Sequence, residues 1–144
     1  MRRGYKYISH TADVEFLAYG STLEESFQNA MLALFETIAY TKKVSASKDA
    51  ARTFTMKVKA DTIEKLLWYT LQDAISILGS RSLFAYRVSG LKINNAKGYA
   101  LTAKVYAKKR RDEDSKLEIK GVSMYELKVE QKKSGFVLRA VVDV

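Results

Sequence analysis

The chain has 144 residues and a formal net charge of +9, with 47% hydrophobic residues, no Cys and no Pro. This length suits one domain whose core needs neither disulfides nor a structural metal, and the hydrophobic content excludes a disordered chain. The lack of Cys and the single His exclude thiolate nucleophiles, zinc ribbons and three-His zinc sites. No apolar run reaches the ~20 residues that span a bilayer. We therefore expect one domain over residues 1–144 of a cytoplasmic protein with no membrane contact.

The positive charge is concentrated in the second half of the chain. Residues 1–72 carry 10 Lys or Arg against 8 Asp or Glu, whereas residues 73–144 carry 15 against 8. A basic half is typical of a protein that binds nucleic acid or an acidic protein partner. An excess of charge also serves solubility alone, so the composition leaves both interpretations open.

The first predicted helix begins after Ser21 and Thr22. Apolar residues recur at three- and four-residue spacing from Leu23 to Ile38, which makes one apolar face. Either Ser21 or Thr22 fits a capping box, because each is followed three residues later by Glu. The pattern predicts a helix over about residues 22–40 that packs on the core.

The second predicted helix follows Asp61. Its apolar stripe extends to Leu78, and Gly79 directly after the stripe is typical of a residue that ends a helix. Asp61 fits the N-cap position, since Glu64 follows three residues later. We expect this helix over residues 61–78.

The remaining segments alternate between apolar and polar residues, which indicates strands. Strands are expected near residues 14–18, 54–58, 83–93, 99–107, 119–130 and 136–142. Residues 94–98 and 133–135 have the composition of turns, and the first of these joins a predicted hairpin. The order of elements favours an α+β fold: one domain with a mostly antiparallel sheet and two main helices packed on one face.

The most distinctive cluster of polar residues is Ser-His-Thr-Ala-Asp at residues 9–13. Thr and Asp commonly bond their own backbone in turns, so the residues alone favour a turn here. The alternative is a metal site, in which the Asp13 carboxylate would be a hard oxygen ligand for calcium, magnesium or manganese. Such a site needs further oxygen ligands from elsewhere in the chain.

The last residues could supply those ligands. Asp143 and the main-chain carboxylate of Val144 lie one residue apart at the end of an apolar strand. Together they would offer two anionic oxygens to one cation. The alternative is a charged strand end in solvent, and the residues alone favour it.

Several kinds of active site lack essential parts. The sequence contains no G-x-S-x-G elbow, no Walker A loop and no G-x-G-x-x-G loop. The basic run at residues 108–111 precedes an acidic run at 112–114, which is typical of a solvated loop but could also contact phosphates. Lys120 lies on the strand after this loop. Catalysis by this chain alone is therefore not expected.

Motifs over most of the chain resemble the archease family. The most specific is the Ser-His-Thr-Ala-Asp-Val segment followed by the first predicted helix. Weaker matches in the same order include Lys-Gly-Val-Ser at residues 120–123 and Val-Val-Asp-Val at residues 141–144. The resemblance implies an accessory protein of RNA processing.

The implied partner is the GTP-dependent RNA ligase that joins tRNA exon halves during splicing. By resemblance, the protein is not an enzyme but promotes attachment of GMP to the ligase's active-site His and supports multiple turnover. An alternative role is a chaperone or modulator of RNA-processing enzymes such as a tRNA methyltransferase, and a metal-dependent hydrolase is a more distant one. Direct binding of tRNA or of another RNA-modifying enzyme is a further expectation.

The resemblance also implies a bound divalent cation, calcium first, with magnesium or manganese as alternatives. Its ligands correspond to Asp13, Asp143 and Val144, whereas His10 and Lys120 correspond to neighbouring or partner-facing residues. The sequence departs from the family where Tyr-His commonly follows the segment around Lys120. Met-Tyr-Glu stands there instead, so the second His is missing.

Overall fold

The computed structural model describes residues 4–8 and 13–144. In chain order its elements are β1 (Gly4–Ile8), β2 (Asp13–Gly20), α1 (Leu23–Ile38), α2 (Thr41–Ala46), β3 (Arg52–Ala60), α3 (Ile63–Arg81), β4 (Leu83–Asn94), β5 (Tyr99–Lys109), η1 (Asp112–Asp114), β6 (Gly121–Val122), β7 (Lys128–Lys132) and β8 (Gly135–Asp143). The α+β class with two main helices is confirmed. Strand β1 and the short helix α2 were not expected from the sequence.

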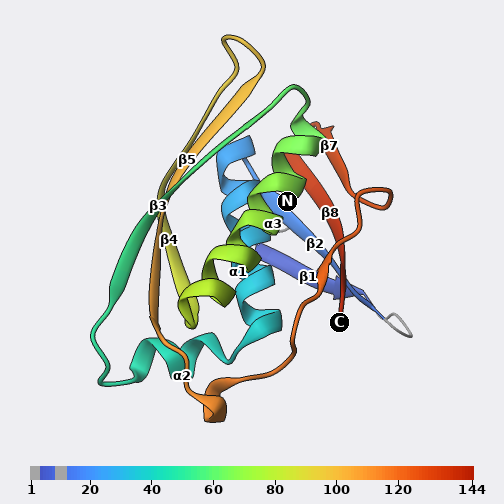
Figure 1. Ribbon diagram of the computed structural model, residues 1–144. Coiled ribbons are helices and arrows are strands. Elements are labelled where there is room, and N and C mark those ends of the chain that lie inside the picture. Colours follow the sequence, from blue (N-terminus) through green and yellow to red (C-terminus); the bar gives the residue numbers. More distant parts are fainter. Residues whose placement is uncertain (1–3, 9–12) are drawn as a thin grey trace.

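The strands form two antiparallel sheets, where the sequence led us to expect one. A five-stranded sheet has the order β1-β2-β8-β6, with β7 also paired to β8, and a three-stranded sheet has the order β3-β5-β4. Figure 1 shows α1 and α3 lying between these two sheets. Helix α1 buries residues on two sides, Ser26, Ala30 and Ala33 on one and Phe27, Met31 and Phe35 on another, so it needs cover from both layers.

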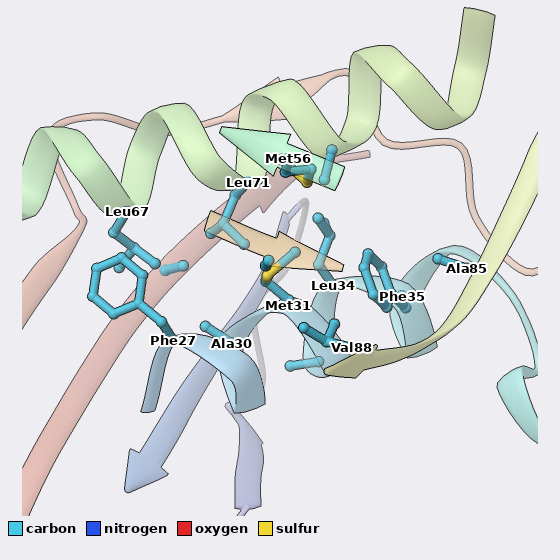
Figure 2. Packing of buried hydrophobic residues seen from close by; sticks show 14 of the residues in the cluster. Phe27, Ala30, Met31, Leu34, Phe35, Met56, Leu67, Leu71, Ala85 and Val88 are labelled. Atoms are coloured by element: carbon cyan, nitrogen blue, oxygen red, sulfur yellow. The ribbon is translucent and has the colours of Figure 1, made fainter. Parts of the chain in front are cut away.

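The core lies where the helices meet both sheets. Figure 2 shows Met31 of α1 and Leu71 of α3 pointing into the same apolar cluster as Met56 of β3 and Val88 of β4. Each of these side chains is at least 95% buried, as is Phe27 at the end of the cluster. Apolar contact between the layers therefore fixes how the two sheets are placed.

Helix α1 has Thr22 as its N-cap, as the sequence predicted, and it ends at Ile38, two residues before the predicted end. The Thr22 hydroxyl accepts a hydrogen bond from the Glu25 amide at 3.1 Å, while the Glu25 carboxylate accepts one from the Ser21 amide at 3.4 Å. The preceding Gly20 lies so close that a Cβ atom there would be 2.3 Å from the Ser26 amide nitrogen. Only glycine lets β2 approach the start of this helix.

Helix α3 differs from the prediction at both ends. Its N-cap is Thr62, whose hydroxyl accepts from the Lys65 amide, while Asp61, one residue earlier, pairs with the Lys65 ammonium at 3.3 Å. At the other end the helix continues through Gly79 to Arg81 and stops at Ser82, which has the left-handed φ of 53°. Asp61 as N-cap and Gly79 as terminator were therefore wrong.

The long strand expected over residues 119–130 was wrong in its middle. Only β6 and β7 are strands, and both pair with the same edge of β8. Val122 lies opposite Val142 and Lys128 opposite Arg139, so residues 123–127 face only two residues of β8 and must bulge outward. The strands expected near 14–18, 54–58, 83–93, 99–107 and 136–142 and both predicted turns are confirmed.

No helix among residues 4–8 and 13–144 is long and apolar enough to cross a membrane.

Candidate metal centre

The two predicted acidic ligands lie opposite each other in the five-stranded sheet. Asp13 is the first residue of β2, Asp143 is the last residue of β8, and the antiparallel register pairs them directly. Directly opposed residues of antiparallel strands place their side chains on the same face, with Cβ atoms about 4.5–5.5 Å apart. The fold thus brings together two carboxylates from opposite ends of the chain.

This acid pair lies on the outer face of the sheet. Along β8, Val142 and Ala140 point to the face opposite to that of Asp143, and both are buried in the core beneath the helices. Asp143 and Asp13 therefore face away from α1 and α3. Asp143 is exposed and Asp13 is half-buried, whereas Val141, the next outward residue of β8, is 1% exposed, so an ion or a partner's groups can approach at the end of the sheet.

A third carboxylate on the same face is already engaged. Glu15 lies two residues after Asp13, is 7% exposed, and accepts a hydrogen bond of 2.7 Å from Arg139 Nε. The Glu15 carboxylate raises the pKa of the Arg139 guanidinium through this hydrogen bond. Among the described residues, no group of three or more His, Cys, Asp or Glu is gathered as a metal site. The third ligand of the predicted set is a group of another kind, a main-chain carboxylate.

Val144 provides such a group in the predicted ligand set. It directly follows Asp143 and is 37% exposed. In the predicted ligand set it would contribute its main-chain carboxylate beside the acid pair. The donors are then all carboxylate oxygens, which are the ligands that calcium, magnesium and manganese prefer. The residues present therefore fit a hard divalent cation, and their role as ligands stays a prediction.

Lys120 is fixed beside the acid pair through its main chain. Its amide donates to the Asp143 carbonyl at 2.8 Å, and Gly121 lies opposite Asp143 in the register. The Lys120 side chain is exposed, so its ammonium is available to an anion that approaches the end of the sheet. His10 lies outside the described residues.

Two residues that the sequence analysis did not single out hold β6 in place. Trp68 Nε1 donates to the Val122 carbonyl at 2.8 Å, and the Gln72 side-chain oxygen accepts from the Val122 amide at 3.1 Å. Trp68 and Gln72 are four residues apart and so lie on one face of α3. In the sequence, two hydrogen-bonding side chains at this spacing beside the apolar stripe were the signal that could have identified this contact. Through β6, α3 supports the strand end that carries Asp143.

These features define a class of protein: a small α+β domain of two antiparallel sheets around two helices, with paired carboxylates at one open sheet end. Comparison with known families matches residues 5–144 to the archease protein family. The chain belongs to this family.

Individual relatives agree with the family match. The chain is 33% identical to the protein archease of Methanosarcina barkeri, over 97% of this chain and 95% of that protein. It is 32% identical to that of Pyrococcus abyssi, over 91% of each. The solution structure of Methanobacterium thermoautotrophicum protein 1598 has a TM-score of 0.75 and 26% identity, covering 98% of this chain and 99% of that one.

A crystal structure from Thermotoga maritima, described as an archease and possible chaperone, shares the fold. Its TM-score is 0.66 at 22% identity, over 100% of this chain and 98% of that one.

Proposed function

We propose that this protein activates a GTP-dependent RNA ligase of tRNA splicing, by promoting attachment of GMP to the ligase and so supporting multiple turnover. The observation that supports this most is the direct opposition of Asp13 and Asp143 at the end of the five-stranded sheet. Membership of the archease family supports it independently. In this proposal the protein completes the ligase's active site and does not itself join RNA.

Asp13, Asp143 and the Val144 carboxylate would hold one divalent cation, with calcium first and magnesium or manganese as alternatives. When bound, the cation would offset negative charge on phosphate oxygens. The chain's own residues set where this happens. Pairing of β2 with β8 fixes the spacing of the two acids, and the Lys120 amide anchors the main chain of Asp143.

Lys120 would add a second cationic group at the same place. Its exposed ammonium, on the residue just before β6, can donate hydrogen bonds to a phosphate. Because the acid pair faces outward, a ligase carrying GTP can reach it without any rearrangement of the helices beneath.

The decisive experiment measures ligation by the cognate ligase under single- and multiple-turnover conditions, with and without this protein. Asp13→Asn and Asp143→Asn should each abolish stimulation of multiple turnover, because each removes an anionic ligand but keeps the side-chain shape. Asp61→Asn is the matched control, since Asp61 is also a surface acid, with a 74% exposed side chain. Lys120→Gln should reduce stimulation by a smaller factor.

Equal multiple-turnover rates with wild type and Asp143→Asn would remove the acid pair from the mechanism. No stimulation by the wild type would favour the second candidate, a chaperone or modulator of RNA-processing enzymes such as a tRNA methyltransferase. The description of the Thermotoga maritima relative as a possible chaperone is the observation behind that candidate.

A further inference from the structure

The outer face of the three-stranded sheet carries cations in every row. The register of β3, β5 and β4 places the following outward-facing residues side by side in four successive rows: Thr53, Tyr106 and Arg87; Thr55, Lys104 and Ser89; Lys57, Thr102 and Lys92; Lys59, Ala100 and Asn94. The cationic residues of these rows are all exposed. Rows two residues apart are separated by about 7 Å, so the cations follow the length of the sheet.

We call this surface the basic face, defined by Lys57, Lys59, Arg87, Lys92 and Lys104. No Asp or Glu occurs anywhere in β3, β4 or β5. The sequence contains no acidic residue between Asp73 and Asp112. Within the described part of the chain, no ion pair joins a cation of the basic face to a carboxylate. The charge of this face is therefore not neutralised within the protein.

Two of the cations are held together around Tyr106. The Arg87 guanidinium lies 4.7 Å and the Lys104 ammonium 5.2 Å from the centroid of its ring. The Ser89 hydroxyl donates to the Tyr106 phenol oxygen at 3.1 Å. This hydrogen bond, together with the charges of Lys104 and Arg87, lowers the pKa of Tyr106. The ring thus holds two like charges near one point, where an anion would be attracted.

The chemistry of the face fits a phosphate backbone better than an acidic protein. Its neutral residues are hydroxyl-bearing Thr and Ser, one Asn, one Ala and Tyr106, and it has no large aliphatic side chain. Protein interfaces depend on a central group of apolar or aromatic side chains in a packed pocket. Phosphate contacts are made by Lys, Arg and the hydroxyls of Ser and Thr, which are the residues present here.

We propose that the basic face binds the backbone of an RNA strand, through its phosphates and 2′-hydroxyls and without base-specific contacts. The Thr and Ser hydroxyls between the cations can donate to and accept from the ribose 2′-hydroxyl, which is the group that distinguishes RNA from DNA. This inference does not rest on the proposed function. The helices separate the basic face from the sheet that carries Asp13 and Asp143 (Figure 1).

The salt dependence of binding should reveal how many cations take part. For a single strand the logarithm of the binding constant falls with the logarithm of salt concentration with a slope of about 0.7 per phosphate neutralised. Five cations therefore give a slope near 3.5 in magnitude, and removal of three should lower it by about 2.

The experiment titrates the purified protein into a labelled 20-nucleotide oligouridine and measures fluorescence anisotropy, at several salt concentrations and without any ligase. A triple variant of the basic face is compared with a control that removes the same charge from the β7–β8 hairpin. The face variant is Lys57→Gln, Arg87→Gln and Lys104→Gln; the control is Lys128→Gln, Lys132→Gln and Lys133→Gln. Circular dichroism confirms that both variants fold.

The face variant should bind oligouridine at least about tenfold more weakly than wild type, with the reduced salt slope, while the control stays within about twofold. Equal losses in both variants would show a general charge effect and overturn the proposal, as would a wild type that does not bind. A deoxy-oligonucleotide of equal length that binds as tightly as the RNA, or an acidic peptide of equal charge that binds more tightly, would also overturn it. Because no ligase is present, these outcomes are independent of the ligase-activation test.

Discussion

The outer faces of the two sheets are built by the same alternation of residues but differ in how they handle charge. On the five-stranded sheet, two cations are paired with carboxylates: Arg139 Nε lies 2.7 Å from Glu15, and the Lys132 ammonium lies 2.8 Å from Glu130. The three-stranded sheet has cations and no carboxylate at all. The acid pair of Asp13 and Asp143 occurs only on the first of these faces.

This difference shows that the inner and outer residues of a strand are under separate constraints. The inward residues of both sheets are apolar and fix the packing on α1 and α3. The outward residues contribute little to the core, so each sheet can present its own chemistry. In the functions proposed above, one layer offers oxygen ligands and the opposite layer offers cations (Figure 1). Two partners could therefore be bound at once on opposite sides.

The substitution with the largest expected effect weakens the packing of both sheets on the helices. Phe27 of α1 is fully buried between the two layers (Figure 2). Phe27→Ala should lower the free energy of unfolding by about 3–5 kcal/mol, because it removes apolar contacts and leaves a cavity. Urea denaturation followed by circular dichroism measures this. A loss below about 1 kcal/mol would mean that the layers are not held together by this cluster.

A second prediction concerns calcium binding at the acid pair of the five-stranded sheet. Calcium at 100 times its dissociation constant should raise the free energy of unfolding of the wild type by about 2.7 kcal/mol, because it binds only the folded pair of acids. Asp143→Asn should lose this stabilisation, and excess EDTA should abolish it in the wild type.

Thermal denaturation with and without calcium measures the effect, with Asp61→Asn as the control that keeps it. A calcium-induced shift of equal size in Asp143→Asn would place the ion elsewhere in the protein.

The smallest predicted effect compares two tyrosines on the two layers. Tyr7 of β1 donates its phenol hydrogen to the Ala33 carbonyl at 2.9 Å, and burial raises its pKa to about 12. Tyr106 of β5, on the basic face, has a pKa below its ordinary value, first through the Ser89 hydrogen bond and then through nearby cations. NMR titration of labelled Tyr ring carbons should therefore show Tyr106 ionising well before Tyr7.

Ser89→Ala and Lys104→Gln should each raise the pKa of Tyr106 and leave that of Tyr7 unchanged. The sign follows because both groups stabilise the phenolate, one by donating a hydrogen bond and one by its positive charge. A Tyr106 pKa that does not respond to either substitution would show that the cations do not gather around its ring.

The sequence determines the inner faces more clearly than the site. Periodicity identified both main helices and most strands, because burial imposes a regular spacing on apolar residues. The chain around Gly79 was different: a Gly after the apolar stripe suggested a helix end, yet the helix continues to Arg81. Leu78 and Leu83, on either side of this last part of the helix, are both buried. Tertiary packing therefore outweighs the local preference of one glycine.

The opposition of Asp13 and Asp143 could not be derived from the residues alone. It depends on which strands pair, and β2 and β8 lie at opposite ends of the chain. The residues alone offered a shared site for the two acids only as the less favoured alternative, and the resemblance to a family made it the prediction. The basic face is similar: the acid-free stretch after Asp73 is visible in the sequence, but the contribution of Lys57 and Lys59 depends on β3 joining β5.

The hydrogen bond from Trp68 to Val122 also gives the protein an intrinsic optical probe. The chain contains a single tryptophan, and its indole donates to β6, the strand that lies beside Asp143. Indole emission responds to the polarity and hydrogen bonding of the ring. An event that displaces β6 would therefore change the fluorescence of one known side chain, and stopped-flow emission can test whether adding calcium or a ligase does so, without any attached dye.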